Sequence, residues 1–308
     1  MALTSRITLT GAPAEDPEDF FGTSLGVIFP DDVMNQHGDA DHGLLYQSPH
    51  LPRPLHISLA DPAGDDDRRL FSHYLWNASL LLAEFVESGT LGLGPEQGGV
   101  ASPLGPPLST FSVAGRSVLE LGAGTALPSL LAALLGATRV VLTDYPAPAV
   151  ISNLTANAAR NARPELLPPP SSSSAPAAVA PVEVEGHAWG ELDTPLAERG
   201  RRAFDRVLVC DCLWMPWQHE NLLRSVEWFL GDGAEARCWV VAGFHTGREK
   251  MSGFFDAERL AGLGLEVESI WERDCDGQER DWVQDRGIED PVARKRWLVS
   301  AVLKRSAP

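Results

Sequence analysis

The chain has 308 residues, 44% of them hydrophobic, which is enough to bury the core of one large domain. Its formal net charge of -17 repels phosphate backbones, so the composition argues against nucleic acid as a partner and fits a cationic partner better. No run approaches the roughly 20 consecutive apolar residues of a membrane span, and the N-terminus lacks the apolar core of a secretory signal, so we expect a cytoplasmic protein without membrane contact.

The first part of the chain lacks a sustained period. Residues 1–67 are rich in Gly, Pro, Asp and His, and we expect them to form an irregular N-terminal arm. From Arg68, apolar residues recur at helical spacing as far as Val86, which predicts an amphipathic helix over residues 68–88. This change of pattern places the start of the principal domain, residues 68–308, at that helix.

The rest of the chain alternates between apolar runs and helical patterns. The runs that predict strands are Ser117–Leu121, Arg139–Thr143, Val182–His187, Phe204–Cys210, Cys238–Gly243, Glu266–Trp271 and Trp297–Leu303. The segments that predict helices are Pro128–Leu135, Ala147–Ala162, His219–Phe229 and Lys250–Leu263. Short strands separated by helices predict an α/β fold, with a Rossmann-like, seven-stranded, mostly parallel sheet and helices on both faces.

Two segments break this alternation. Residues 164–181 are rich in Pro, Ser and Ala, and they have too little apolar surface to offset the entropy of ordering, so we expect a flexible surface insertion. A charged stretch from Asp274 to Arg296 joins the last two predicted strands without a helix. We therefore expect these two strands to pair antiparallel as a hairpin at the sheet edge, with Trp297–Leu303 as the edge strand.

The four cysteines show neither CxxC spacing nor a cluster with histidine that would indicate zinc. Three of them lie in stretches that read as strands or strand ends, where a reduced, buried thiol is the usual arrangement. The sequence therefore predicts no metal site. It contains no heptad repeat either, and we expect a monomer.

The strongest functional signal is a strand, a glycine turn and a helix in direct succession, SVLELGAGTALPSLL. Gly122 and Gly124 permit a sharp turn that brings backbone N–H groups and a helix N-terminus close to a ligand. A dinucleotide fingerprint needs a third glycine three residues after Gly124, where this chain has leucine. Asp144 ends the next strand, where an acid in such folds accepts hydrogen bonds from ribose hydroxyls. Together with Glu120 ahead of the turn, these residues predict a nucleoside cofactor and disfavour NAD and FAD.

In chain order, the segments LFSHYLWNAS, VLELGAGTALPSLL, VVLTDYP, HAWGE and VLVCDCLWMPWQHENLL resemble family 16 of the seven-strand S-adenosylmethionine methyltransferases. The resemblance runs from about Leu70 to Lys304 and implies S-adenosylmethionine as the cofactor. It implies that Trp76 lines the cofactor pocket, that Asp144 holds the ribose and that Trp189 flanks the adenine. The resemblance and the strand-end pattern together give one set of candidate cofactor-binding residues: Trp76, Glu120, Gly122, Ala123, Gly124, Asp144, Tyr145, Trp189 and Cys210.

A second motif concerns the acceptor of the methyl group. Related protein-lysine methyltransferases carry Asp-x-x-Tyr or Asp-x-x-Phe after the fourth strand, and this chain has Asp211 and Trp214 at that spacing. The resemblance is greatest to fungal members that act on elongation factor 1-alpha, which implies a protein lysine or N-terminal amine of that factor as the acceptor. As candidate catalytic residues, Asp211 would hold the ammonium and pass its proton to water, and Trp214 would hold the cation by its ring face.

Two other functions stay open at this point. One is a small-molecule N-methyltransferase acting on a pyridine such as nicotinamide. The other is a catalytically idle module that binds the cofactor and docks to a partner through residues 1–67 or 68–88. Gly122, Gly124 and Asp144 do not distinguish these functions, because they address the cofactor and not the acceptor.

Two loop features have a weaker interpretation. His245 follows the fifth predicted strand, and we interpret it as incidental, because a loop histidine without an identified partner seldom has a function. Trp214 and Trp217 flank Pro216, which favours an aromatic mouth over a hydrophobic staple for the following helix.

Overall fold

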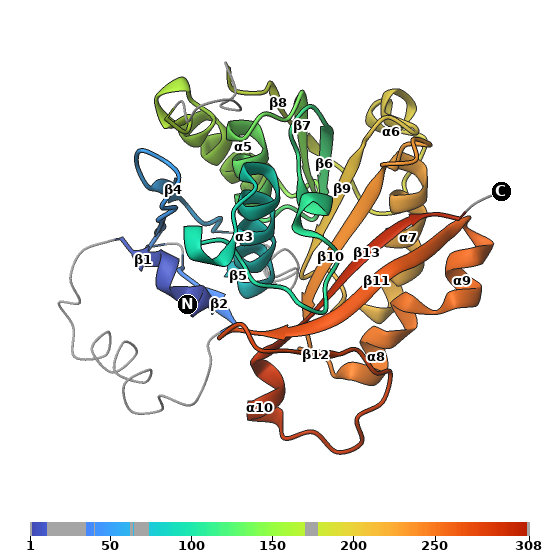
Figure 1. Ribbon diagram of the computed structural model, residues 1–308. Helices are drawn as coiled ribbons and strands as arrows, with labels where there is room; N and C mark the ends of the chain where they lie inside the picture. The colour runs from blue at the N-terminus through green and yellow to red at the C-terminus, as the bar shows by residue number, and fades with distance from the viewer. Residues whose placement is uncertain are drawn as a thin grey trace.

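The computed structural model describes residues 2–10, 35–39, 41–61, 64, 74–169 and 178–306 (Figure 1). Its centre is an eight-stranded sheet in the order β12-β11-β13-β10-β9-β6-β7-β8. The strands are β6 (Ser117–Leu121), β7 (Arg139–Asp144), β8 (Val182–Gly186), β9 (Arg206–Cys210), β10 (Arg237–Gly243), β11 (Leu265–Asp274), β12 (Glu279–Asp281) and β13 (Trp297–Arg305). The predicted α/β fold is confirmed, and β12 is added to the seven predicted strands.

The five strands from β10 to β8 pair in parallel. All of β9 is buried, and β6 is buried from Val118 onward. Helices cover both faces of such a sheet, which is why β6 and β9 appear in the sequence as mainly apolar runs. From β6, the chain builds the sheet through β7 and β8 in one direction and through β9 and β10 in the other. The carboxyl ends of β6 and β9 therefore meet at the point where sheets of this kind bind ligands.

Two hydrophobic cores lie on opposite faces of the sheet, and Figure 1 shows the helices that cover these faces. Alternate residues of one strand, such as Leu208 and Val209 of β9, belong to different cores, as the pleat requires. One core packs α3 (Asn77–Leu91), α4 (Leu127–Leu134) and α5 (Pro148–Asn161), and the other packs α6 (Pro195–Gly200), α7 (His219–Phe229) and α9 (Ala257–Gly262). Within the residues that the structure describes, none of the helices has both the length and the hydropathy of a membrane span.

The C-terminal part differs from the prediction in two ways. The helix predicted over Lys250–Leu263 is divided into α8 (Arg248–Ser252), a 3-10 turn (Gly253–Phe255) and α9. The division occurs because Asp256 is extended and its side chain caps α9 by accepting from the Arg259 amide at 2.8 Å.

The last two predicted strands do pair antiparallel, as β11 and β13. However, β13 lies between β10 and β11, so the prediction that Trp297–Leu303 is the edge strand is wrong. The edge is instead β12, which folds from the charged stretch Asp274 to Arg296 together with α10 (Pro291–Lys295). This placement completes the backbone hydrogen bonds of β13 on both sides.

Two predicted segments fall partly outside the described residues. Residues 65–73 are not described. Residues 74–76 are described and are not helical, because Leu75–Trp76 form strand β5, so the helix predicted over residues 68–88 is wrong there and begins at Asn77. Residues 170–177 are not described, so the central part of the predicted insertion 164–181 also lies outside. The described end of that segment joins the fold, because the Ala180 amide donates to the Ala133 carbonyl at 3.0 Å.

The described parts of residues 1–67 form strands that pack on the domain. Strands β1 (Ile7–Leu9), β3 (Leu44–Tyr46) and β4 (Leu55–Ile57) make one antiparallel sheet, and β2 (Gln36–His37) pairs with β5. Arg6 forms ion pairs with Glu84 and Glu87 of α3, and all three side chains are largely buried. The arm that we expected to be irregular thus has ordered elements where it is described. The boundary between residues 67 and 68 stays a prediction.

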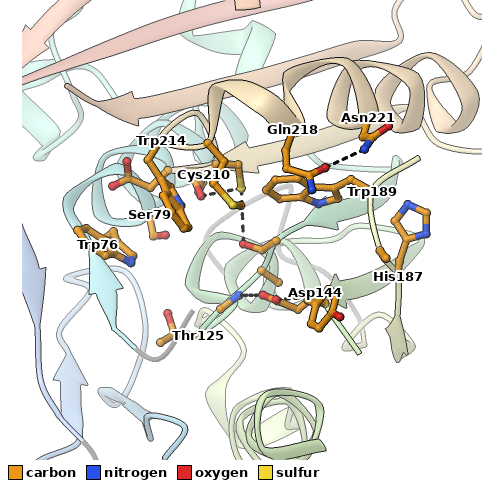
Figure 2. A pocket seen from close by; sticks show the side chains of 18 of the residues that line it. Trp76, Ser79, Thr125, Asp144, His187, Trp189, Cys210, Trp214, Gln218 and Asn221 are labelled. Carbon is orange, nitrogen blue, oxygen red and sulfur yellow. Dashed lines mark hydrogen bonds between the residues drawn. The ribbon is translucent and has the colours of Figure 1, made fainter. Parts of the chain in front are cut away.

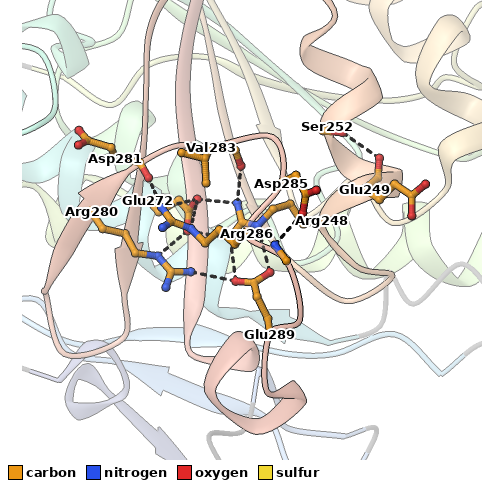
Figure 3. Close-up of polar contacts among 11 residues, drawn as sticks. Arg248, Glu249, Ser252, Glu272, Arg280, Asp281, Val283, Asp285, Arg286 and Glu289 are labelled. Atoms are coloured by element: carbon orange, nitrogen blue, oxygen red, sulfur yellow. Dashed lines mark hydrogen bonds and ion pairs between the residues drawn. The ribbon is translucent and has the colours of Figure 1, made fainter.

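A buried network of charges fixes the segment between β11 and β13 (Figure 3). Arg248, at the start of α8, donates to both carboxylate oxygens of Glu272 at 2.5 and 3.0 Å and to both of Glu289 at 3.0 Å. Arg280 and Arg286 also donate to Glu272, whose side chain is fully buried. A buried carboxylate is tolerable only with such partners, so the network holds α8, β11 and β12 to one another.

We expect Arg248→Met to lower the free energy of unfolding by about 3 kcal/mol, because it leaves Glu272 buried with fewer partners. Urea denaturation followed by circular dichroism measures this loss. The matched control is Arg199→Met, whose partners Glu183 and Glu185 are roughly two-fifths exposed and whose loss should cost less than about 1 kcal/mol. Equal losses in the two variants would contradict the importance of the buried network.

Candidate functional site

A cavity of about 460 Å³ opens at the carboxyl ends of β6, β7, β8 and β9 (Figure 2). The lining residues are Tyr74, Trp76, Ser79, Gly122, Ala123, Gly124, Thr125, Asp144, Tyr145, His187, Ala188, Trp189, Gly190, Glu191, Cys210, Asp211, Cys212, Trp214, Met215, Gln218 and Asn221. Figure 2 shows Trp76 and Trp214 toward one end, Trp189 and His187 toward the other, and Asp144 between them along one wall. The cavity thus has two ends that present different side chains.

The glycine turn after β6 forms part of the cavity wall. Gly122 has φ +67°, and a Cβ there would lie 2.7 Å from the Cys212 Sγ and 3.0 Å from the Trp189 Cζ2. Gly124 also has positive φ, at +54°. A residue with a side chain at Gly122 would therefore be strained by its backbone and would collide with the loops after β8 and β9. Only glycine allows the three loops to meet.

Asp144 is held rigidly at the end of β7. Its Oδ2 accepts from the Gly124 amide at 2.8 Å, and its Oδ1 accepts from the Tyr145 amide at 2.7 Å. Each oxygen keeps a second lone pair that a ligand could use. Burial raises the pKa of this carboxyl to about 6, and the two amide donors only partly oppose that effect.

Glu120 lies in β6 behind the turn and does not line the cavity. It is fully buried, and neither carboxylate oxygen has a hydrogen bond of good geometry. The pKa of Glu120 is raised to about 8, mainly by burial; the hydrogen-bonding groups of Ser129 oppose this rise, and the nearby Asp144 charge adds to it. Two desolvated carboxyl groups therefore lie close to one part of the cavity wall.

Asp211 follows β9 in a left-handed conformation, φ +55°, which is uncommon for a residue with a side chain. Its Oδ1 accepts from the Gly243 amide at 2.9 Å and from the His245 Nε2 at 2.8 Å. Its Oδ2 is buried without a partner. The interpretation of His245 as incidental rested on the lack of a partner, and the structure gives it one in Asp211, a residue of the cavity wall.

Polar residues that the sequence pattern did not predict lie at the end of the cavity near Trp189. His187 contacts the Ser225 Oγ at 3.0 Å through its Nε2, and burial lowers its pKa to about 4, so it is neutral. Asn221 donates to the Gln218 Oε1 at 2.8 Å. Both Gln218 and Asn221 stand at the start of α7, and only their position after a strand-end loop could have signalled them.

The fold brings the predicted residues together. All candidates except Glu120 line the cavity: Trp76, Gly122, Ala123, Gly124, Asp144, Tyr145, Trp189, Cys210, Asp211 and Trp214. They come from segments spread over more than a hundred residues of chain. Those from Gly122 to Trp214 meet because parallel strands present their carboxyl ends at one edge, and Trp76 joins them from β5, outside the central sheet. The structure gives their positions, and their roles stay predictions. Among the described residues, no three His, Cys, Asp or Glu side chains are grouped as metal ligands would be.

Comparison with known proteins gives a family and several relatives. A family model described as lysine methyltransferase matches residues 64–259. The protein N-terminal and lysine N-methyltransferase EFM7 of Gibberella zeae is 30% identical over 234 residues, which are 73% of this chain and 75% of that protein. The efm7 protein of Schizosaccharomyces pombe, which has the same description, is 27% identical over 71% of this chain and 79% of its own.

Among solved structures, the ribosomal protein L11 methylase from Lactobacillus delbrueckii subsp. bulgaricus aligns with 63% of this chain and 72% of its own, at 15% identity and a TM-score of 0.38. So distant a likeness adds nothing to the sheet topology, which defines the fold by itself.

We expect Gly122→Ala to lower the free energy of unfolding by about 3 kcal/mol, because it adds collisions with Cys212 and Trp189 to the backbone strain. Gly115→Ala is the matched control, since Gly115 has φ +70° and no atom within 4 Å of the place where the added methyl group would lie, and it should cost only about 1 kcal/mol. Urea denaturation measures both. Similar losses would show that the loops can move apart and that the turn is not tightly enclosed.

The raised pKa of Glu120, about 8, makes stability depend on pH. Between the pKa of an unfolded glutamic acid, about 4.3, and that value, the folded state keeps a proton that the unfolded state has released. Folding stability therefore falls as pH rises through this window. Glu120→Gln removes this contribution.

We expect the stability of Glu120→Gln relative to wild type to increase by about 2 kcal/mol from about pH 6 to about pH 8. Urea denaturation of the ligand-free protein at several pH values measures the difference. Glu198→Gln, at an exposed position of α6, is the control and should follow wild type. A constant offset between Glu120→Gln and wild type across this range would contradict the buried, protonated carboxyl.

Proposed function

The chain belongs to the lysine methyltransferase family, and on that premise we propose that it transfers a methyl group from S-adenosylmethionine to a lysine or N-terminal amine of a protein. The observation that carries this proposal is the cavity in which the glycine turn, the fixed Asp144 carboxylate and the Asp211 carboxylate meet. The relatives named above are described as N-terminal and lysine N-methyltransferases, which supports the same class of acceptor.

The residues of the cavity fit S-adenosylmethionine. The glycine turn lines the cavity with Gly122, Ala123 and Gly124, and Asp144 keeps lone pairs for the two ribose hydroxyls. Trp189, at the end of the cavity near Asp144, offers an aromatic surface for the adenine. We assign the holding of this cofactor to Trp76, Gly122, Ala123, Gly124, Asp144, Tyr145, Trp189 and Cys210, with Glu120 acting through its charge from behind the turn.

The charge of the cofactor supports the assignment. The raised pKa values of Glu120 and Asp144 mean that their ionised forms are poorly stabilised in the ligand-free protein. A ligand with positive groups, such as a sulfonium and an ammonium, would favour those ionised forms. A dinucleotide, with its two phosphate charges, would oppose them.

When bound, S-adenosylmethionine supplies an electrophilic methyl group, whose bond to sulfur breaks with its electron pair going to sulfur as the amine nitrogen lone pair forms the new bond. The protein therefore has to orient a neutral amine and exclude water. Asp211 would accept a hydrogen bond from the amine of the substrate and pass the proton that this amine loses to water. Trp214 would hold the substrate's ammonium cation against the face of its ring. Trp217, 71% exposed, stands edge to face with Trp214 at 6.4 Å, so the two indoles extend from the cavity to the surface.

We propose elongation factor 1-alpha as the protein substrate, in the cytoplasm, and a monomeric enzyme. The net charge of -17 supports a basic translation factor as partner, because opposite charges steer association. The exposed Trp217, which contacts Trp214, would meet the substrate around the target amine.

The test uses the purified chain, methyl-labelled S-adenosylmethionine and purified elongation factor 1-alpha, with peptide mass spectrometry to locate the methyl groups. We expect label on a lysine or on the N-terminus of the factor. Calorimetry should show that Asp144→Asn weakens S-adenosylmethionine binding at least about tenfold, because a charged acceptor of hydrogen bonds is lost. Asp193→Asn, at an exposed position outside the cavity lining, should leave binding unchanged.

Other outcomes identify other functions. Methylation of nicotinamide in place of any protein would make the chain a small-molecule N-methyltransferase. Binding of S-adenosylmethionine with no acceptor methylated in a cell lysate would make it an idle binding module. Unchanged affinity in Asp144→Asn would overturn the assignment of the cavity itself.

A further inference from the structure

His245 is held against the backbone at the end of β10. Its Nε2 lies 2.8 Å from the Asp211 Oδ1, and a Cβ on Gly243 would lie only 2.7 Å from the same Nε2. The Trp76 ring packs edge to face on the imidazole, with centroids 4.9 Å apart. Trp76 of β5, Asp211 after β9 and Gly243 at the end of β10 thus fix this ring, although His245 does not itself line the cavity.

The partner of His245 has an unusual arrangement of hydrogen bonds. Both donors, the Gly243 amide and His245, approach the Oδ1 of Asp211, while Oδ2 is buried without any partner. Leaving a buried carboxylate oxygen unpaired costs about 1 to 3 kcal/mol or more. Asp211 also keeps a left-handed backbone at φ +55°, which orients its side chain. Asp211 lines the cavity, so a small local shift on binding would let a bound molecule supply the donor that the buried Oδ2 lacks.

We propose that His245 is a positioning residue, which occupies Oδ1 of Asp211 so that Oδ2 receives an N–H of the acceptor amine. This inference rests on the proposed function, and it deepens that function by naming the atom that orients the nitrogen. Without the imidazole, Asp211 can rotate, and its two oxygens become equivalent acceptors for the Gly243 amide and the amine. The nitrogen lone pair is then no longer held in one direction.

Electrostatics support the same arrangement. Burial by itself lowers the pKa of His245, but the neighbouring Asp211 charge and the hydrogen bond to it outweigh burial and leave the pKa raised. The imidazole therefore stays a donor to Oδ1. The thiols of Cys210 and Cys212 on either side of Asp211 have strongly raised pKa values because they are buried, so they stay neutral and add no competing charge.

The experiment compares His245→Gln, His245→Asn and His245→Ala with wild type in the methylation assay with elongation factor 1-alpha. Gln places an amide N–H at a reach similar to that of Nε2, whereas the Asn amide is too short and Ala has no donor. We expect Gln to retain kcat within about threefold, and Asn and Ala to lose at least about tenfold in kcat (about 1.4 kcal/mol). Calorimetry should give S-adenosylmethionine affinities within about twofold of wild type for all three.

The pair Gln and Asn keeps the test valid if His245→Ala does not fold, because both are polar and differ only in reach. The inference is overturned if Asn and Gln lose kcat equally, if Asn keeps wild-type kcat, or if cofactor affinity falls in parallel with kcat. A wild-type enzyme that methylates no protein would overturn the proposed function and this inference with it. An active wild type with an unaffected His245→Asn would overturn only the inference.

Discussion

The hydrogen bond from the Gly124 amide to the Asp144 carboxylate, 2.8 Å long, joins the ends of β6 and β7. It forms because the two glycines turn the chain through positive φ angles, and it fixes the carboxylate before any ligand arrives. Because Gly122 has no Cβ, the side chains of Cys212 and Trp189 can lie against the same turn. Loops after three separate strands therefore form one packed wall, and the rest of the cavity is built on that wall.

Buried acids give this wall its chemical character. Glu120, Asp144 and Asp211 are all at most 7% exposed, and none is paired with an arginine or lysine within the described residues. Their burial costs folding free energy in the ligand-free protein, as the raised pKa values of Glu120 and Asp144 indicate. A cationic cofactor and a cationic acceptor would reduce that cost. The folded, ligand-free protein is thus less stable because of the acidic residues that would bind these ligands.

Segments remote in sequence complete the end of the cavity at Trp76. Strand β5, which carries Trp76, is held by β2 of the N-terminal arm, and the Leu3 amide donates to the Cys275 carbonyl at 2.8 Å. The network around Glu272 holds α8, which begins three residues after His245. The arm and the charged C-terminal segment therefore belong to the structure that positions Trp76 and His245. Both segments thus contribute to the cavity and do not only extend the sheet.

The sequence by itself determined the features that depend on neighbours along the chain. Apolar runs gave β6, β7, β9 and β10, and the glycine turn followed by Asp144 at the next strand end gave the cofactor side of the site, because strand period and turn chemistry are local properties. The family resemblance added Asp211 and Trp214. All the candidate residues line one cavity except Glu120, which lies behind its wall.

Only the tertiary structure decided the features that depend on contacts between distant residues. The contact of His245 with Asp211 spans 34 residues, and no local pattern marks it. The three-residue strands of the arm are too short to show a period. Strand β13 occupies the middle of the sheet and not its edge, because β11 and β12 cover it, and the order of strands is set by packing and not by sequence order.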